Sequence, residues 1–279
     1  MWQPEFDPPP PRRRRRWLRA VLLISALAAA VLAGFVWLSM PDVQALARTN
    51  PETTAFIELR RSRAREEQRP FRLRWRWRNL AAISPYLRHA VIDAEDARFW
   101  EHEGVDWEAV KEAAERDWED KRLSHGASTI TQQVAKNLYL SPSRNPLRKL
   151  RELLIARRLE RELSKRRLLE IYLNIAEWGG DGVFGAEAAA QRWYGCSAAE
   201  LSPAQAARLA VALPNPKRFS PAHRSAYLTR KAERLLRAML RDRLIDSAQL
   251  ERAAAELASP AAAAEPRPRA AELAKPSIR

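Results

Sequence analysis

A glutamate on an apolar helical stripe is the first residue in this sequence whose type and position could do chemistry. At helical spacing one face would carry Leu87, Val91, Glu95 and Phe99. Burying a carboxylate is costly unless it is paired or protonated, and partial desolvation raises its pKa toward that of a useful base. Glu95 is therefore a candidate catalytic base. The alternative is a plain ion pair with Arg98, three residues on.

The segment SHGASTITQQVAKNLYL, residues 124–140, has the pattern of a capped helix. Thr129 can cap it, with Gln132 completing a capping box, and Ser128 is the alternative cap. Gln132 and Lys136 would then lie one turn apart on the same side. Amide protons at such a helix start can hold an anion or sugar oxygens. An ordinary capped helix would show the same pattern.

A third segment begins with a helix start surrounded by positive charge. Asn145 can cap this helix, and Pro146 suits its first position. The clustered cations are Arg144, Arg148 and Lys149, and Glu152 lies one turn after Arg148. Cations at a helix N-terminus oppose the helix dipole, so they indicate a bound anion such as a diphosphate. The alternative is a solvated basic face.

Glu170, in the segment LLEIYLN, is a further candidate carboxylate. Arg166 stands four residues earlier and could neutralise it, while Asn174 extends the polar row by one turn. A surface ion pair is the simpler interpretation and would contribute little.

Composition predicts a mostly helical protein that meets an anionic partner. The chain has 279 residues, 46% of them hydrophobic and 8 of them Gly, and it is rich in good helix formers. Residues 83 to about 257 form a run of helical patterns with short Gly, Pro and Ser punctuation. The net charge of +15 favours nucleic acid, an acidic membrane or a phosphorylated substrate. The single cysteine, Cys196, excludes an intrachain disulfide.

The N-terminal region predicts a membrane anchor. Residues 1–16 are rich in Pro and Arg and are expected to be disordered, whereas residues 20–40 are uncharged and long enough to span a bilayer. The apolar stretch runs well past Ala28, where a signal peptide would have been cleaved. Because arginines precede the span, residues 1–19 are expected in the cytoplasm and residues 41–279 beyond the membrane. That placement excludes DNA binding.

Three further segments complete the expected organisation. Residues 41–80 form a basic connector that ends in FRLRWRWRNL, whose alternating Arg and Trp fit either an edge strand or a segment at the lipid interface. Residues 81–257 form the catalytic domain. Residues 258–279 are low in complexity and are expected to be disordered.

Five blocks of the sequence, taken together and in order, resemble the peptidoglycan glycosyltransferases, the family shared by monofunctional transglycosylases and class A penicillin-binding proteins. The blocks are residues 95–104, 126–133, 148–152, 165–174 and 185–195. Residues 174–179, NIAEWG, are similar to the monofunctional Gram-negative branch. The sequence contains neither Lys-Thr-Gly nor Ser-x-x-Lys, the motifs of a penicillin-binding domain.

The resemblance implies an all-α, lysozyme-like fold with two lobes and a groove between them. It also implies that Glu95 is the base that deprotonates the 4-hydroxyl of GlcNAc on incoming lipid II. That hydroxyl attacks C1 of MurNAc at the end of the growing chain, undecaprenyl diphosphate leaves, and the anomeric centre inverts. Glu170 is grouped with Glu95 among the catalytic residues, in a supporting role.

The resemblance assigns the remaining site residues to substrate binding. Lys136, Arg144, Arg148 and Lys149 match residues that hold phosphates or stabilise the departing charge. Glu152 matches a supporting acid, and Gln132, Gln133 and Ser128 match groove residues. A divalent cation, Mg or Mn, is compatible with the diphosphate, although the sequence shows no dedicated metal cage. Expected partners are lipid II, the growing glycan, the inner membrane and proteins of cell-wall synthesis or division.

Two other functions remain open at this point. A lysozyme or lytic transglycosylase would also need a catalytic glutamate, but it would not need cations around a helix start. A non-enzymatic membrane scaffold would need the positive charge but not Glu95.

Overall fold

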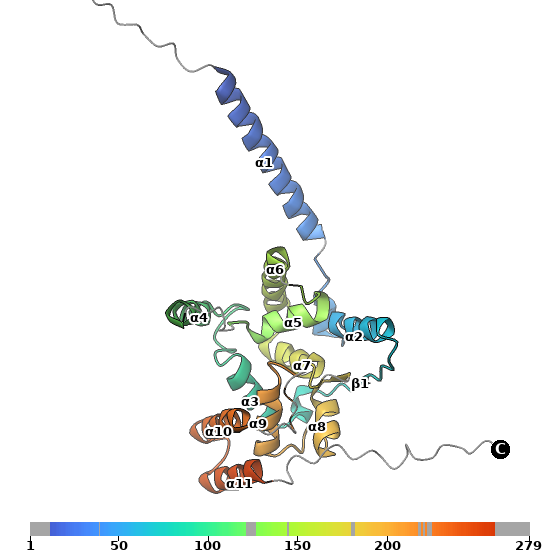
Figure 1. The fold of residues 1–279 in the computed structure, drawn as a ribbon, viewed down its shortest axis with the longest axis vertical. Coiled ribbons are helices and arrows are strands. Elements are labelled where there is room, and N and C mark those ends of the chain that lie inside the picture. Colours follow the sequence, from blue (N-terminus) through green and yellow to red (C-terminus); the bar gives the residue numbers. More distant parts are fainter. Residues whose placement is uncertain are drawn as a thin grey trace, which may run out of the picture. The chain divides into compact units, whose positions relative to one another are not determined.

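The structure is a computed structural model that describes residues 12–38, 40–120, 127–143, 145–179, 182–216, 219, 221 and 225–259. The chain divides into two compact units, Met1–Asp42 and Val43–Arg279. Figure 1 shows the elements of both units, coloured along the sequence.

In the first unit the described residues form the helix α1 (Arg12–Leu38). It begins earlier than expected, because residues 12–16 are helical rather than disordered. Arginine is a good helix former, so a helix nucleated in the apolar stretch can extend through these residues. Among the residues that the structure describes, no helix is both long and apolar enough to cross a bilayer. Residues 1–11 and 39, and several side chains of α1, lie outside that description, so the span over 20–40 stays a prediction.

The segment expected to be a connector belongs to the second unit from Val43 onward. Its elements are η1 (Gln44–Ala47), α2 (Ala55–Glu66), β1 (Arg74–Trp75) and η2 (Leu80–Ala82). β1 pairs in parallel with β2 (Val183–Phe184), with Arg74 opposite Val183. The strand alternative for the Arg/Trp segment is therefore confirmed at these two residues.

One group of helices packs around α3. The group consists of α3 (Pro85–Glu95), α9 (Pro203–Ala212), α10 (Ala226–Arg241) and α11 (Ser247–Ala258). Ala206, Ala207 and Ala210 on α9 are fully buried, and such small side chains let helices approach closely. α10 is strongly amphipathic, burying Leu236 and Met239 while its arginines face solvent.

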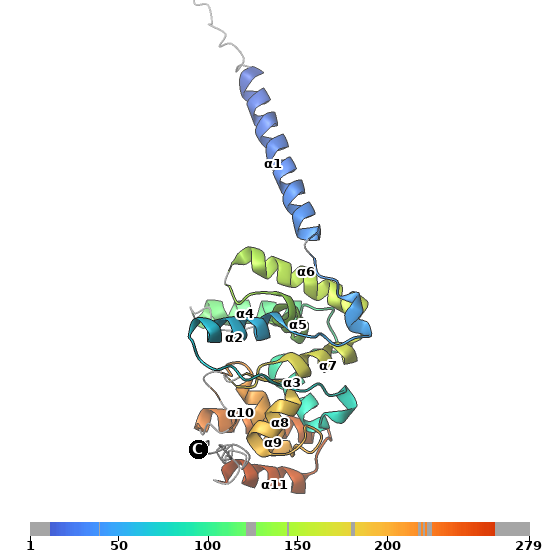
Figure 2. The same ribbon diagram turned by 90° about the vertical axis from the view of Figure 1, so that its right-hand side faces the viewer.

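A second group packs around α5. It consists of α2, α5 (Ile130–Tyr139), α6 (Pro146–Glu162) and α7 (Lys165–Ile175), and α7 also contacts α8 (Ala186–Tyr194). Figure 2 shows α5 and α6 on one side of α3 and α7, with α9, α10 and α11 on the other. α4 (Trp107–Asp120) leaves its two tryptophans largely exposed, and residues 121–126 after it lie outside the described residues.

The described residues confirm the expected all-α class, with the two short strands as additions. α3 ends at Glu95 where it meets α5, so the candidate base lies at the junction of the two helix groups. The predicted tail, residues 258–279, lies outside the described residues except for its first two residues, and Ala258 ends α11.

Candidate active site

Glu95 is the last residue of α3, and its carboxylate is only partly used by the protein. Leu87 and Val91, on the same stripe, are fully buried, whereas Glu95 is partly exposed. Its Oε2 accepts a hydrogen bond of 2.6 Å from Nε2 of Gln133. Its Oε1 is buried and has no hydrogen-bond partner in the part of the chain that the structure describes. One oxygen is thus held in place and the other is left to accept a proton.

The surroundings of Glu95 suit it to act as a base. Burial raises the pKa of its carboxyl, and neighbouring Asp96 adds to the increase. The hydrogen bond from Gln133 and the charges of Lys136 and Lys231 oppose the increase. A carboxylate whose pKa lies above its ordinary value binds a proton more strongly, which suits it to act as a base.

The ion pair expected as an alternative for Glu95 is not formed. Because α3 ends at Glu95, Arg98 no longer lies one helical turn away. Arg98 instead makes two hydrogen bonds to Asp106, of 2.9 and 3.1 Å. Asp106 in turn accepts the amide proton of Ala109 at the start of α4. The interpretation of Glu95 as half of a surface ion pair is therefore wrong.

A buried tyrosine that the sequence analysis left without a role orients the partner of Glu95. The hydroxyl of Tyr172 on α7 donates to Oε1 of Gln133 at 3.1 Å. With its oxygen held in this way, the Gln133 amide directs its NH2 group to Glu95. Tyr172 is fully buried, and burial raises the pKa of its phenol well above the usual value, so it remains a neutral donor.

Removing the Gln133 amide should change the pH dependence of any reaction that uses Glu95 as a base. The hydrogen bond stabilises the charged carboxylate, so Gln133→Ala should raise the pKa of Glu95 further. The base works only when deprotonated, so the acidic limb of kcat/KM should move to higher pH. At pH values on this acidic limb, kcat/KM of Gln133→Ala should be about tenfold lower than that of the unchanged protein, which is the effect of losing one charge-assisted hydrogen bond.

The control for this prediction is Gln191→Ala, which removes an exposed glutamine on α8. Its kcat/KM profile should match that of the unchanged protein. An acidic limb that stays in place, or that moves to lower pH in Gln133→Ala, would remove Gln133 from the control of Glu95.

The start of α5 is fixed by Asp96 and His102. Asp96 Oδ2 accepts the amide proton of Ile130 at 2.9 Å, and Nε2 of His102 lies 2.9 Å from Oδ1. Nδ1 of His102 accepts from the amide of Gly104, so Nε2 carries the ring proton and donates to Asp96. This network holds α5 in register with Glu95 and thereby positions Gln133.

The predicted capping box at Thr129 and Gln132 is confirmed, and it leaves a different role for Gln132. Gln132 is buried, and its side chain accepts from the amide of Thr129, so it serves the helix start rather than an exposed groove surface. The amide protons of Thr129, Ile130 and Gln132 already have protein acceptors. Of the two alternatives for this helix start, the ordinary capped helix describes these three amides, and one of them donates to the protein's own Asp96 carboxylate.

The cations of the third segment do converge. Asn145 caps α6 and Pro146 is its first residue, as predicted. Glu152 is buried and accepts from Nη1 of Arg148 and Nζ of Lys149, each at 2.5 Å. Lys149 also lies 3.4 Å from the hydroxyl of Ser128, which is exposed. Arg144 lies outside the described residues.

Lys136 joins this cluster from α5. Burial lowers the pKa of its ammonium group, and the charges of Glu152 and Glu95 oppose that decrease. Lys136 therefore lies within electrostatic range of both carboxylates and connects the cationic cluster to Glu95. Arg148 and Lys149 share the buried carboxylate of Glu152, and Lys136 lies within electrostatic range of it, so the cluster holds more cationic groups than this carboxylate can neutralise and can attract an anion.

Glu170 lies in a different environment from the one expected. It pairs with Arg167 rather than with Arg166, because Arg167 also reaches back to the backbone of Leu46. Its second oxygen accepts the amide proton of Leu80 at 2.9 Å. Asn174, one turn on, accepts from the amide of Arg78. Glu170 thus fastens the segment before α3 to α7, and its supporting role in catalysis stays a prediction.

A pocket of about 300 Å³ opens beside Glu95. It is lined by the end of α3, the start of α4 and the residues before α5, including Asp93, Glu95, Asp96, Arg98, Asp106, Ser128 and Thr129. Lys231 on α10 also places its charge near Glu95. No local pattern pointed to Lys231, because it lies far along the chain in an amphipathic helix. Gln133, Lys136 and Ser128 thus gather around Glu95 and the cationic cluster. Gln132 and Glu170 bond to the protein's own backbone, and their roles toward substrate and in catalysis stay predictions.

A helical domain that combines a partly buried candidate base with an adjacent cationic cluster is suited to an enzyme that deprotonates one group and stabilises an anion nearby. Comparison with known proteins agrees with this class. The profile of the family described as "Transglycosylase" matches residues 64–240. The chain belongs to the transglycosylase family.

Its relatives include proteins named biosynthetic peptidoglycan transglycosylase. The protein of Nitrosospira multiformis is 48% identical over 187 residues, which cover 67% of this chain and 81% of that protein. The protein of Laribacter hongkongensis is 46% identical, with 68% and 83% covered. The protein of Janthinobacterium sp. (strain Marseille) is 49% identical, with 68% and 82% covered.

Proposed function

We propose that this enzyme polymerises the glycan strands of bacterial peptidoglycan from a lipid-diphosphate precursor. The observation that carries the proposal is the free oxygen of Glu95 next to a cluster of net positive charge. Membership of the transglycosylase family and the names of the relatives support it. The reaction belongs to the cell envelope, where peptidoglycan is assembled.

The proposed step is a single displacement with inversion. Oε1 of Glu95 takes the proton from the 4-hydroxyl of GlcNAc on incoming lipid II, while Gln133 holds Oε2. The hydroxyl oxygen forms a β-1,4 bond to C1 of MurNAc on the growing chain as the bond from C1 to the diphosphate oxygen breaks. Undecaprenyl diphosphate leaves with the bonding electron pair, and the proton stays on Glu95 until solvent removes it.

The cationic cluster serves the leaving group in this scheme. Negative charge grows on the diphosphate as its bond to C1 breaks, so cations held nearby lower the barrier. Buried Glu152 fixes Arg148 and Lys149 in position, so these groups need little rearrangement during the reaction. Arg144, which lies outside the described residues, is proposed to join them, and Ser128 to contact the sugar or phosphate oxygens.

A divalent cation at the diphosphate would have to be held mainly by the substrate. Both oxygens of Glu152 are engaged by Arg148 and Lys149. Among the described residues no group of three or more His, Cys, Asp or Glu side chains could hold a metal ion. Mg²⁺ is commonly bound through substrate phosphates, so a Mg or Mn ion that arrives with the diphosphate is compatible with these residues.

The proposed reaction is tested with purified lipid II. The full-length chain should convert lipid II into a polymer that lysozyme digests, and it should release no soluble sugars from purified peptidoglycan. Release of sugars without polymer formation would instead identify a glycan-cleaving enzyme. An enzyme that only cleaves glycans would not need the cationic cluster near Glu152, because its substrate carries no diphosphate.

We also propose that residues 20–40 anchor the enzyme in the inner membrane, with the N-terminus in the cytoplasm and the catalytic unit in the periplasm. The uncharged length of this stretch and the arginines that precede it support the anchor. Proteins of cell-wall synthesis or division are proposed partners at that surface.

Deleting residues 1–42 should separate catalysis from membrane attachment. The remaining unit, Val43–Arg279, is compact by itself, so it should polymerise lipid II in detergent at a rate within about threefold of the full chain. On lipid II vesicles its rate should fall at least about tenfold, because the tether no longer concentrates enzyme and substrate on one surface. Equal loss of activity in detergent would mean that residues 1–42 contribute to the binding site.

A further inference from the structure

Two helices of the second unit carry charged stripes that have opposite sign and the same spacing. The stripes consist of Arg230, Arg234, Arg237 and Arg241 on α10, and of Glu108, Glu112, Glu115 and Glu119 on α4. In both stripes the side chains follow one another after four, three and four residues. This spacing places all four on one side of an α-helix, over a length of about 16 Å. The two stripes therefore match each other in length and in charge.

Both stripes face solvent. The side chains of Arg237 and Arg241 are 71% and 68% exposed, and those of Glu108 and Glu115 are 79% and 62% exposed. The other four members are exposed as well. α10 packs on α3, α9 and α11 through its apolar face, which leaves the arginines on the opposite face available to a partner.

The arginine stripe has one end that the protein leaves without a partner. Arg230 and Arg234 have neither an ion pair nor a side-chain hydrogen bond among the residues that the structure describes. Arg237 and Arg241, at the other end, pair with acidic side chains at 3.0 to 4.0 Å. Ion pairs as exposed as these contribute little to stability, so a docking partner can replace them at low cost.

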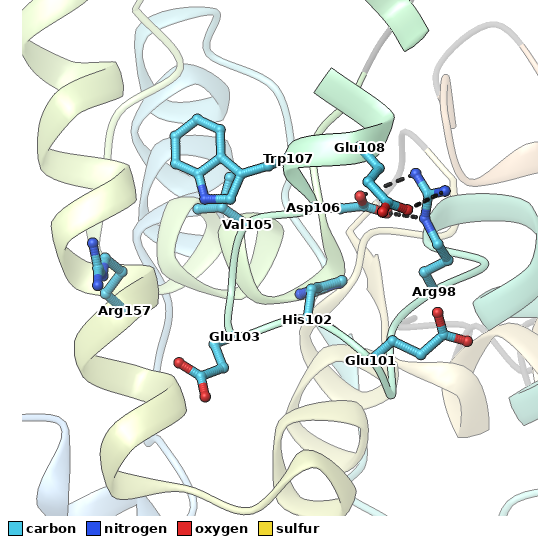
Figure 3. A pocket seen from close by; sticks show the side chains of 9 residues that line it. All are labelled: Arg98, Glu101, His102, Glu103, Val105, Asp106, Trp107, Glu108 and Arg157. Carbon is cyan, nitrogen blue, oxygen red and sulfur yellow. Dashed lines mark hydrogen bonds and ion pairs between the residues drawn. The ribbon is translucent and has the colours of Figure 1, made fainter. Parts of the chain in front are cut away.

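The glutamate stripe is divided in the same way. Glu119 has no ion pair within the described part of the chain, and Glu115 reaches only a lysine of its own helix, at 3.9 Å. Glu108 and Glu112, at the start of α4, pair with Arg98 at 3.0 and 3.2 Å. Figure 3 shows Glu108 beside Arg98 where the chain enters α4.

A partner with both charges explains the two stripes better than a partner with one. Within the described residues, no ion pair or hydrogen bond joins one stripe to the other, so the chain does not neutralise them internally. An anionic lipid surface would account for the arginines but not for the matched glutamates. Tyr227 is the one large apolar side chain that α10 exposes, so this helix also lacks an apolar face to insert into lipid.

We infer that α10 of one copy of this chain docks on α4 of a second copy, with the two helices antiparallel and the arginines facing the glutamates. The antiparallel direction brings the weakly paired ends of the two stripes together and opposes the two helix dipoles. Figure 1 shows α4 and α10 on the same side of the second unit. A two-fold axis can therefore form the same contact twice in a closed dimer.

The docked helix reaches the pocket beside Glu95. Glu112 belongs to the lining of that pocket and to the glutamate stripe. In the antiparallel register it faces Arg237 of the second copy, so the second copy brings a cation to the rim of the pocket. The interface itself does not depend on which reaction Glu95 catalyses.

The test measures the dimer dissociation constant of the full-length chain in detergent, by sedimentation. The unchanged protein should dimerise at low ionic strength, and the dimer should weaken between about 50 mM and about 500 mM salt. Arg234→Glu and Glu115→Arg should each raise the dissociation constant at least about tenfold, because a dimer contains each change twice. The chain that carries both changes should dimerise as the unchanged protein does, since the antiparallel register lets the new charges pair.

The matched control is Arg252→Glu, which changes the net charge as Arg234→Glu does, at an exposed position on α11. It should leave the dissociation constant unaltered, and circular dichroism should show the same helical signal for every variant. A monomeric unchanged protein, equal weakening by the control, or a double variant that does not recover would each overturn the interface. Dimers that no charge reversal affects would place the association elsewhere. A monomer that binds poly-glutamate through Arg234 would instead assign α10 to a different acidic protein.

Discussion

Glu95→Gln should abolish most of the polymerisation of lipid II while leaving the protein folded. The substitution keeps the size of the side chain but removes the oxygen that can take up a proton. Loss of a general base lowers the rate on the order of a hundred- to ten-thousand-fold. Oε1 of Glu95 has no protein partner among the described residues, so replacing the carboxylate leaves no buried charge unpaired and should cost little stability.

The matched control for this prediction is Glu251→Gln, an exposed glutamate on α11. It should retain far more of the initial rate than Glu95→Gln, because α11 contributes no residue to the pocket at Glu95. The measurements are the initial rate with lipid II and the helical signal in circular dichroism. Turnover close to normal in Glu95→Gln, with an unchanged spectrum, would exclude Glu95 from the mechanism.

Lys136→Ala and Lys149→Ala should each lower kcat on the order of a hundredfold, and the loss should persist at high salt. Both ammonium groups belong to the cluster around Glu152, and burial lowers the pKa of Lys136. Charge-assisted hydrogen bonds in a partly buried site are stronger and less screened than those at the surface. The loss should appear in kcat because the charge on the leaving group grows toward the transition state.

The controls for the lysines are Lys111→Ala and Arg63→Ala. Each also removes one positive charge, from α4 and from α2, outside the cluster. A model in which charge only attracts the enzyme to an anionic surface predicts similar losses at all four positions. Those losses would be about 1 kcal/mol per charge, or roughly fivefold, and salt would erase them. Equal and salt-sensitive losses across a salt series would contradict the diphosphate site.

The sequence by itself was sufficient to predict features that depend on neighbours along the chain. The capping box at Thr129 and the cap at Asn145 were both predicted correctly, and the spacing already placed Glu152 one turn from Arg148, with which it pairs. Each of them is set by residues two to four positions apart, where helical geometry alone brings the side chains together. Glu95 was found because its stripe carries a carboxylate among buried apolar residues, and the family motifs fixed the class of enzyme.

Tertiary structure decided the features that depend on where helices end and which helices meet. Arg98 pairs with Asp106 rather than with Glu95, because α3 ends at Glu95. Glu170 accepts a hydrogen bond from the backbone amide of Leu80. The contact of Tyr172 with Gln133 and the charge of Lys231 near Glu95 join residues that are far apart in the chain. No local periodicity encodes such pairs, because packing of the two helix groups, rather than propensity, determines which side chains face one another.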